Sequence, residues 1–185
     1  MSDAPIRIAV LVGSLRRQSV NRRLAQVAVD HAPEGVELVV VDGLDDLPFY
    51  NEDVDVDGLR SPAVDRVRSQ VGAADAVLLV TPEYNGTIPA LLKNAIDWLS
   101  RPYGSGALAG LPVGVIGAAL SRFAGTWSRQ DARRSVGIAG ANVVEDVEIG
   151  VGPGGLDVEG EPSPELVDEL VAAVRTLAGA VAVAV

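Results

Sequence analysis

Continuously apolar runs alternate with helix-like spacing along this chain of 185 residues. The run Arg7–Val12 (RIAVLV) is typical of a strand buried on both faces of a parallel sheet. Other segments place apolar residues at every third or fourth position, which is the spacing of one helix face. The pattern predicts five strands, at Arg7–Val12, Val36–Val41, Ala76–Val80, Pro112–Ile116 and Asn142–Val147. It also predicts five helices, at Asn21–Ala32, Pro62–Ala74, Pro89–Leu99, Thr126–Ile138 and Pro164–Ala182.

Two connecting segments carry no regular pattern: Asp42–Asp57 is irregular and acidic, and Gly150–Gly160 is a glycine-rich loop. Apolar strands interleaved with helices predict an α/β fold, a doubly wound five-stranded parallel sheet with helices on both faces. Right-handed crossovers leave few topologies, and we expect the flavodoxin-like strand order. No repeat or linker interrupts the pattern, so we expect a single domain over residues 1–185.

Composition excludes several classes of function. The net charge of −10 argues against a general nucleic-acid binder, which needs a basic face. The chain has no cysteine and one histidine, His31, so thiolate chemistry, disulfides and multi-histidine metal sites are excluded. Asp3 stands where a signal peptide is basic, and no apolar helix is long enough to span a membrane. We therefore expect a cytoplasmic protein.

The loop after the first strand predicts an anion site. It reads GSLRRQSVN over residues 13–21, and a helix follows, whose first amides have no partner within the helix. Residues 4–29 contain five arginines and no acidic residue, against the negative charge of the whole chain. The candidate phosphate-binding residues are Ser14, Arg16, Ser19 and Asn21. The alternative is that Ser19 or Asn21 merely caps the helix and the arginines are solvated. Neither GxxxxGK[ST] nor GxGxxG is present.

The loop after the third strand, Thr81–Pro89, predicts a site for a planar ligand. It contains the strong turn dipeptide Asn85-Gly86 between stiffening prolines. Backbone amides in such a turn can line the edge of a flat ring, and Tyr84 offers an aromatic surface. The candidate residues are Pro82, Glu83, Tyr84, Asn85 and Gly86. The alternative is an ordinary strand–helix connection. Carboxyl ends of neighbouring parallel strands share one sheet edge, where ligands bind in such folds.

The pairing of GSLRRQSVN with TPEYNGTIPALLKNAIDWLSRP closely resembles the NADPH-dependent FMN reductase family, which has a flavodoxin-like fold. The resemblance implies bound FMN, with NADPH or NADH as reductant and a small-molecule electron acceptor. It places the FMN phosphate on the first loop, at Ser14, Arg16, Ser19 and Asn21. It places the isoalloxazine on the second loop, at Pro82, Glu83, Tyr84, Asn85 and Gly86. It also implies a homodimer or homotetramer, for which Trp98, Phe123 and Trp127 are candidate interface residues, unless they belong to the core.

The sequence departs from the family pattern after the fourth strand. The family often places glycines and small polar residues there, whereas this chain has GAALSRFAG over residues 117–125, in which Ser121 and Gly125 are the nearest substitutes. The resemblance implies an NAD(P)H-dependent FMN oxidoreductase, in which the cofactor carries the chemistry. An FMN-binding electron carrier without nicotinamide turnover, or a flavin-free phosphate-binding domain, remains the alternative.

Overall fold

The structure, a computed structural model, describes residues 4–181 and has a single five-stranded sheet in that range. The strands are β1 (Ile6–Val12), β2 (Val36–Val40), β3 (Ala76–Val80), β4 (Pro112–Ala118) and β5 (Asn142–Val151). The α-helices are α1 (Val20–Asp30), α2 (Pro62–Gly72), α3 (Ala90–Leu99), α4 (Thr126–Ile138) and α5 (Pro164–Val181). All ten predicted elements are present, and Ala182, the predicted end of the last helix, lies outside the described residues.

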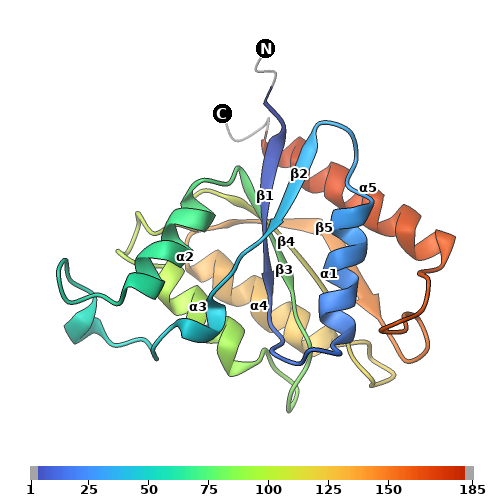
Figure 1. The fold of residues 1–185 in the computed structure, drawn as a ribbon, viewed down its shortest axis with the longest axis horizontal. Coiled ribbons are helices and arrows are strands. Elements are labelled where there is room, and N and C mark those ends of the chain that lie inside the picture. Colours follow the sequence, from blue (N-terminus) through green and yellow to red (C-terminus); the bar gives the residue numbers. More distant parts are fainter. Residues whose placement is uncertain (1–3, 182–185) are drawn as a thin grey trace.

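The sheet is parallel throughout and has the order β2-β1-β3-β4-β5 (Figure 1). This is the flavodoxin-like order, and it confirms the predicted fold. The chain winds in one direction from β1 to β2 and in the other from β3 onward, so β1 and β3 flank the point of reversal. Val12 pairs with Val80 at the carboxyl ends of these two strands. The loops that follow them therefore begin side by side.

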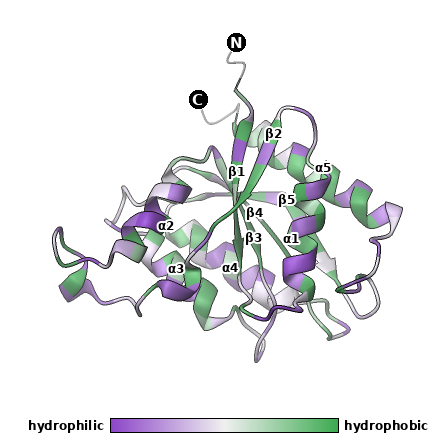
Figure 2. Cartoon of the chain, in the orientation of Figure 1, coloured by the Kyte–Doolittle hydropathy of each residue, from purple (hydrophilic) through white to green (hydrophobic). Residues whose placement is uncertain are grey.

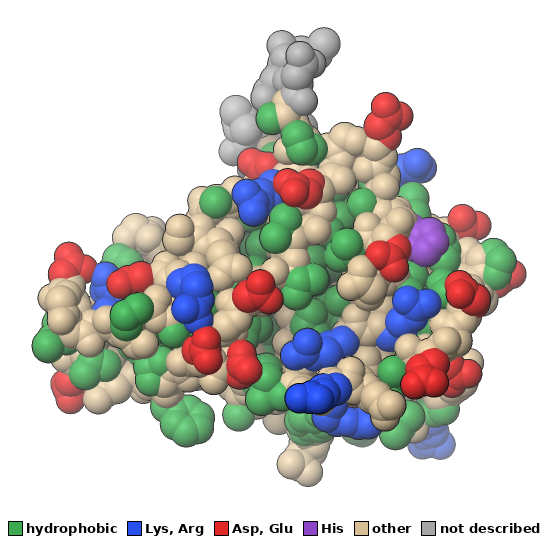
Figure 3. All heavy atoms as spheres, in the orientation of Figure 1, with side chains coloured by type: hydrophobic (Ala, Val, Ile, Leu, Met, Phe, Trp, Pro, Cys, Tyr) green, Lys and Arg blue, Asp and Glu red, His purple; other side chains and the backbone are tan. Residues whose placement is uncertain are grey.

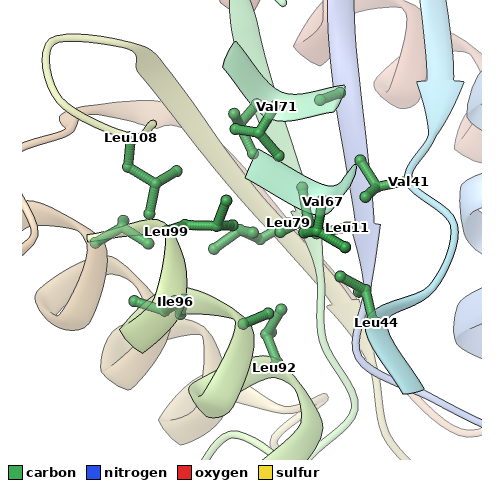
Figure 4. Close-up of a cluster of buried hydrophobic side chains, with 14 of the residues drawn as sticks. Leu11, Val41, Leu44, Val67, Val71, Leu79, Leu92, Ile96, Leu99 and Leu108 are labelled. Carbon is green, nitrogen blue, oxygen red and sulfur yellow. The ribbon is translucent and has the colours of Figure 1, made fainter. Parts of the chain in front are cut away.

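Helices cover both faces of the sheet, α1 and α5 on one face and α2, α3 and α4 on the other (Figure 1). Each face has its own apolar core, and in Figure 2 the middle of the sheet is mostly green, whereas purple lies on the helices, the loops and the outer parts of β1 and β2. In the core under α2 and α3, Val67 and Leu92 meet Leu11 and Leu79 from the central strands (Figure 4). Burial on both faces explains why these strands read as unbroken apolar runs.

Strand β5 is longer than predicted. Its register against β4 shifts between Val113, which pairs with Val143, and Val115, which pairs with Glu148. Beyond the irregularity, buried Val147, Ile149 and Val151 alternate with exposed residues. This alternation is typical of a strand at the sheet edge, and it continues the strand beyond Val147, where the prediction ended. Gly150, predicted to begin the glycine-rich loop, therefore lies within the strand.

The acidic segment after β2 is held by charged hydrogen bonds. It contains two short 3₁₀ helices, Leu44–Asp46 and Glu52–Val54, where the sequence predicted irregular structure. Asp55 accepts hydrogen bonds from both terminal nitrogens of Arg68, each at 2.9 Å, and from Arg60 at 3.1 Å. These hydrogen bonds, led by that from Arg68, hold the pKa of Asp55 below its usual value against the opposing effect of burial.

Candidate FMN site at the carboxyl edge of the sheet

The loops after β1 and β3 touch, as predicted for two loops at one sheet edge. The Gly13 amide donates to the Val80 carbonyl at 2.8 Å. A Cβ atom at Gly13 would lie 3.1 Å from the Pro89 side chain and 3.2 Å from that of Pro82. Glycine at this position therefore allows the two loops to pack directly against each other.

The first loop turns into the N-terminus of α1 at Ser19. The Ser19 hydroxyl accepts a hydrogen bond from the Arg22 amide at 3.4 Å, so Ser19 is the helix cap that the sequence offered as an alternative. The Arg22 Nε donates back to the Ser14 carbonyl at 3.0 Å and closes the loop on the helix. Ser14 is buried, whereas Arg16 is exposed and makes no hydrogen bond or ion pair within residues 4–181.

Asn21 joins the start of α1 to the end of β4. Its side chain is buried, its Nδ2 donates to the Ala118 carbonyl at 2.9 Å, and its Oδ1 accepts from the Ala118 amide at 2.8 Å. Each end of an amide can make one further hydrogen bond. Asn21 can therefore still contact a phosphate, and that contact stays a prediction. The hydrogen bonds between Asn21 and Ala118 were not predicted from the sequence.

The second loop contains the turn that its sequence predicted. Tyr84 and Thr87 exchange backbone hydrogen bonds of 3.1 and 3.2 Å, and Asn85 and Gly86 between them have positive φ angles of 53° and 75°. Two consecutive residues in this region make a type I′ turn, for which Asn-Gly is the favoured pair. The Glu83 carboxylate accepts from the Ser128 amide at 3.2 Å, in the first turn of α4. A carboxylate is favourable there because the helix dipole is positive at that end.

A third wall comes from the residues after β4, which the sequence did not identify. Ala118, Ala119 and Leu120 line the cleft between the first two loops. A Cβ atom at Gly117 would stand 2.2 Å from the Thr81 carbonyl oxygen, so glycine permits this wall to approach the second loop. Ser121 and Gly125, the nearest substitutes that the sequence offered for the family pattern, do not line the cleft, and the buried Ser121 hydroxyl has no partner within the described residues.

These three loops enclose a cleft of about 150 Å³ at the carboxyl edge of β1, β3 and β4. Seven of the nine predicted site residues line it: Ser14, Arg16, Ser19, Asn21, Pro82, Glu83 and Tyr84. Asn85 and Gly86 form the turn just beyond it. A second cavity of about 220 Å³ shares Arg16 and residues 118–120 and extends along residues 151–158. Together the two cavities reach the lower size range of small-molecule sites, roughly 300–1,000 Å³.

The electrostatics of the cleft favour an anion at its α1 side. Basic side chains gather over the N-terminal end of α1, where the first loop carries Arg16 and Arg17 (Figure 3). Within the described residues, no group of three or more acidic or histidine side chains has a metal-binding arrangement, and no helix combines the length and apolarity needed to cross a bilayer.

A buried cation supports the loop between β4 and α4. Arg129 lies beneath this loop and donates to the Ala124 carbonyl and, at 3.4 Å, to Glu148. Burial lowers the pKa of Arg129, and the nearby Glu148 carboxylate acts in the opposite direction. Ala124 has a positive φ of 49°, unusual for a residue with a side chain, and its hydrogen bond to Arg129 stabilises that conformation.

Comparison with known proteins agrees with this site. The model of the NADPH-dependent FMN reductase family matches residues 6–154, which include all three loops. The chain belongs to this family. A quinone reductase from Pseudomonas putida is 41% identical over 129 residues, covering 70% of this chain and 68% of that protein. An NAD(P)H-dependent FMN reductase from Pseudomonas aeruginosa is 44% identical over 123 residues, covering 66% and 64%.

A solved structure supports the assignment of this chain to the NADPH-dependent FMN reductase family. FerB, a flavoenzyme NAD(P)H:acceptor oxidoreductase from Paracoccus denitrificans, superposes with a TM-score of 0.81 at 30% identity and covers 93% of this chain and 97% of its own. The protein is therefore an oxidoreductase that uses FMN and NAD(P)H. The exposed, unpaired Arg16 and the free amides at the start of α1 fit the anionic end of this cofactor.

Proposed function

We propose that this protein passes two electrons from NAD(P)H, through FMN in the cleft, to a small acceptor of the quinone class. The net reaction is NAD(P)H + H⁺ + quinone → NAD(P)⁺ + hydroquinone. The observation that carries the proposal is the meeting of an unpaired arginine, a helix N-terminus and a rigid Asn85-Gly86 turn around one cleft. The quinone class follows from the P. putida relative, which is named as a quinone reductase.

The first loop would hold the phosphate of FMN. Arg16 supplies a charged donor with no competing acidic partner, and the amides at the start of α1 point into the same region. Ser14 and Ser19 place hydroxyl groups on the wall of the cleft. These donors suit a doubly charged phosphate, and they account for a local basic surplus in an acidic protein.

The second and third loops would hold the isoalloxazine. The stiff segment from Pro82 to Gly86 presents peptide groups and the half-exposed Tyr84 ring. The small side chains of Ala118 and Ala119 leave room for a flat ring. FMN held there would supply the redox chemistry between the nicotinamide and the acceptor. The chain itself needs no thiol or imidazole for this reaction, because its residues bind, orient and exclude water.

The phosphate assignment is tested with Arg16→Ala. Loss of one charge-assisted contact is expected to weaken FMN binding by roughly 10- to 150-fold. Riboflavin, which lacks the phosphate, should bind the variant and the wild type equally. Arg17→Ala is the matched control, because Arg17 is exposed on the same loop but does not line the cleft. Fluorescence titration measures both ligands, and an unchanged FMN affinity in Arg16→Ala would remove the assignment.

The enzymatic assignment is tested by anaerobic addition of NADH or NADPH to the FMN-loaded protein, followed by a quinone. Rapid bleaching of the flavin absorbance and stoichiometric recovery on quinone addition are expected. An electron carrier would bind FMN but show negligible nicotinamide oxidation. We further propose that residues 1–185 form a single domain and that the protein is a cytoplasmic homo-oligomer. Analytical ultracentrifugation of the full chain tests the oligomeric state, and localisation of a tagged copy tests the compartment.

A further inference from the structure

Two exposed aromatic rings form a surface beside the cleft. Phe123 and Trp127 have ring centroids 5.1 Å apart, inclined at 44°, and are 43% and 48% exposed. We call this pair the aromatic shelf. Aromatic residues make up just 4% of the chain, and the other tryptophan, Trp98, is fully buried in the core. Exposure of large rings at one place is therefore a feature that the packing of the fold does not require.

The aromatic shelf continues the wall of the cofactor cleft. The Trp127 ring comes within 3.8 Å of where a side chain on Gly86 would begin, so it stands against the turn of the second loop. The next residue, Ser128, donates its amide to Glu83, which lines the cleft. Phe123 follows Leu120, another cleft residue, by three positions. The aromatic shelf is thus tied to the second and third loops at the mouth of the cleft.

A cation borders the aromatic shelf. The Arg122 guanidinium lies 4.5 Å from the centre of the Phe123 ring and makes no hydrogen bond or ion pair within the described residues. The acid on the adjoining turn of α4, Asp131, is already engaged by Thr87 at 2.6 Å and by Arg134. An anionic group next to Phe123 would therefore meet Arg122 as an uncompensated charge.

We propose that the aromatic shelf is the binding platform for the electron acceptor, and that it selects planar aromatic quinones carrying an anionic substituent. Phe123 and Trp127 contact the ring system of the acceptor, and Arg122 contacts the anionic group. This inference rests on the proposed function, because it names the acceptor class of the same site. The exposed Tyr84 and Leu120 line the cleft next to the aromatic shelf, so an acceptor on the shelf would lie beside the proposed cofactor site.

The first test compares acceptors in Trp127→Ala. The probes are 1,4-naphthoquinone, which is planar, and ferricyanide, which is not. Loss of ring stacking is expected to raise the KM for naphthoquinone roughly 2- to 12-fold relative to the KM for ferricyanide. Trp127→Phe should restore most of the difference. Tyr103→Ala is the control, because Tyr103 is also an exposed aromatic residue but lies by the opposite, C-terminal end of α4.

The second test addresses charge. Arg122→Gln should reduce the preference for 1,4-naphthoquinone-2-sulfonate over 1,4-naphthoquinone, measured as the ratio of kcat/KM values. Added salt should diminish the same preference in the wild type, because an exposed charge pair is screened. Binding can also be measured without turnover, as the saturable quenching of tryptophan fluorescence by anthraquinone-2-sulfonate. This quenching should disappear in Trp127→Phe, whereas the emission of the buried Trp98 should remain.

Three outcomes would overturn the inference. Equal KM ratios in Trp127→Ala and the wild type would remove the platform. An unchanged sulfonate preference in Arg122→Gln would remove the charge selection. A lower sedimentation mass in Trp127→Ala, with unaltered acceptor kinetics, would assign the aromatic shelf to contact with a second copy of the chain. Failure of the proposed function is distinguishable, since the wild-type protein would then oxidise NAD(P)H with none of the acceptors.

Discussion

Replacement of Asn21 by alanine separates a structural from a ligand-binding role. The Asn21 amide makes two hydrogen bonds to Ala118, which is 97 residues away in the sequence, and the side chain is 1% exposed. Alanine would leave the amide and the carbonyl of Ala118 without partners inside the protein. The same change would disconnect the start of α1 from the end of β4, which form two walls of the cofactor cleft.

The expected loss of stability follows from these two orphaned groups. A buried polar group without a partner costs about 1–3 kcal/mol, so Asn21→Ala should lower the free energy of unfolding by about 2–5 kcal/mol. The lower end applies if water enters the vacated space. For a protein of this size, 1 kcal/mol corresponds to roughly 2–4 °C in Tm, so the melting temperature should fall by about 10 °C.

The assay is urea unfolding of the FMN-free protein, monitored by circular dichroism. Ser19→Ala is the control, because it removes a helix cap in the same loop at a typical cost of about 1 kcal/mol. If Asn21→Ala unfolds at the same urea concentration as the wild type yet loses FMN affinity, the reasoning is refuted. The amide would then serve the ligand and not the fold.

Two further predictions concern the segments that frame the site. Asp55→Asn should lower the free energy of unfolding by roughly 2–4 kcal/mol, because it leaves Arg60 and Arg68 without their shared carboxylate. The pKa of Asp55 is lower in the folded state than its ordinary value of 3.8. Its stabilising effect is therefore complete above pH 3.8 and is lost as the pH falls through the folded-state pKa. The free energies of unfolding of wild type and variant, measured in urea, should converge at acidic pH. Gly117→Ala places a Cβ against the Thr81 carbonyl and should weaken FMN binding, whereas Gly114→Ala meets the buried Val147 side chain in the core and should lower stability with little effect on FMN affinity. Equal FMN affinities in these two glycine variants would contradict the prediction.

Local patterns in the sequence were sufficient to predict the architecture and the turn in the second loop. The run RIAVLV becomes a central strand because both of its faces are covered, and the order of strands follows from right-handed crossovers. Asn85 and Gly86 adopt the left-handed angles of a type I′ turn, which asparagine tolerates and which glycine adopts readily because it has no Cβ. In both cases the residues that determine the structure are neighbours in the sequence.

Features of the structure that depend on contacts between residues distant in the sequence could not be predicted. The residue to which Asn21 is bonded, Ala118, offers its backbone, and no feature of an alanine side chain reveals this. The third wall of the cleft was missed for the same reason, since Ala118, Ala119 and Leu120 carry no polar side chain. The extension of β5 was missed because its last residues alternate buried and exposed positions and include Gly150, which the sequence assigned to the following loop.

The contacts around the cleft differ between its cofactor side and its acceptor side. On the cofactor side, Gly13 packs against the Pro82 and Pro89 side chains and Gly117 against the Thr81 carbonyl, so a side chain added at either glycine would displace a wall. On the acceptor side, Phe123 and Trp127 are half exposed and extend from a loop and a helix end that Arg129 and Glu83 secure from below. Substitutions of these two rings leave those supports in place. Acceptor preference can therefore change in this fold at little cost in stability, whereas changes in cofactor binding require the walls themselves to move.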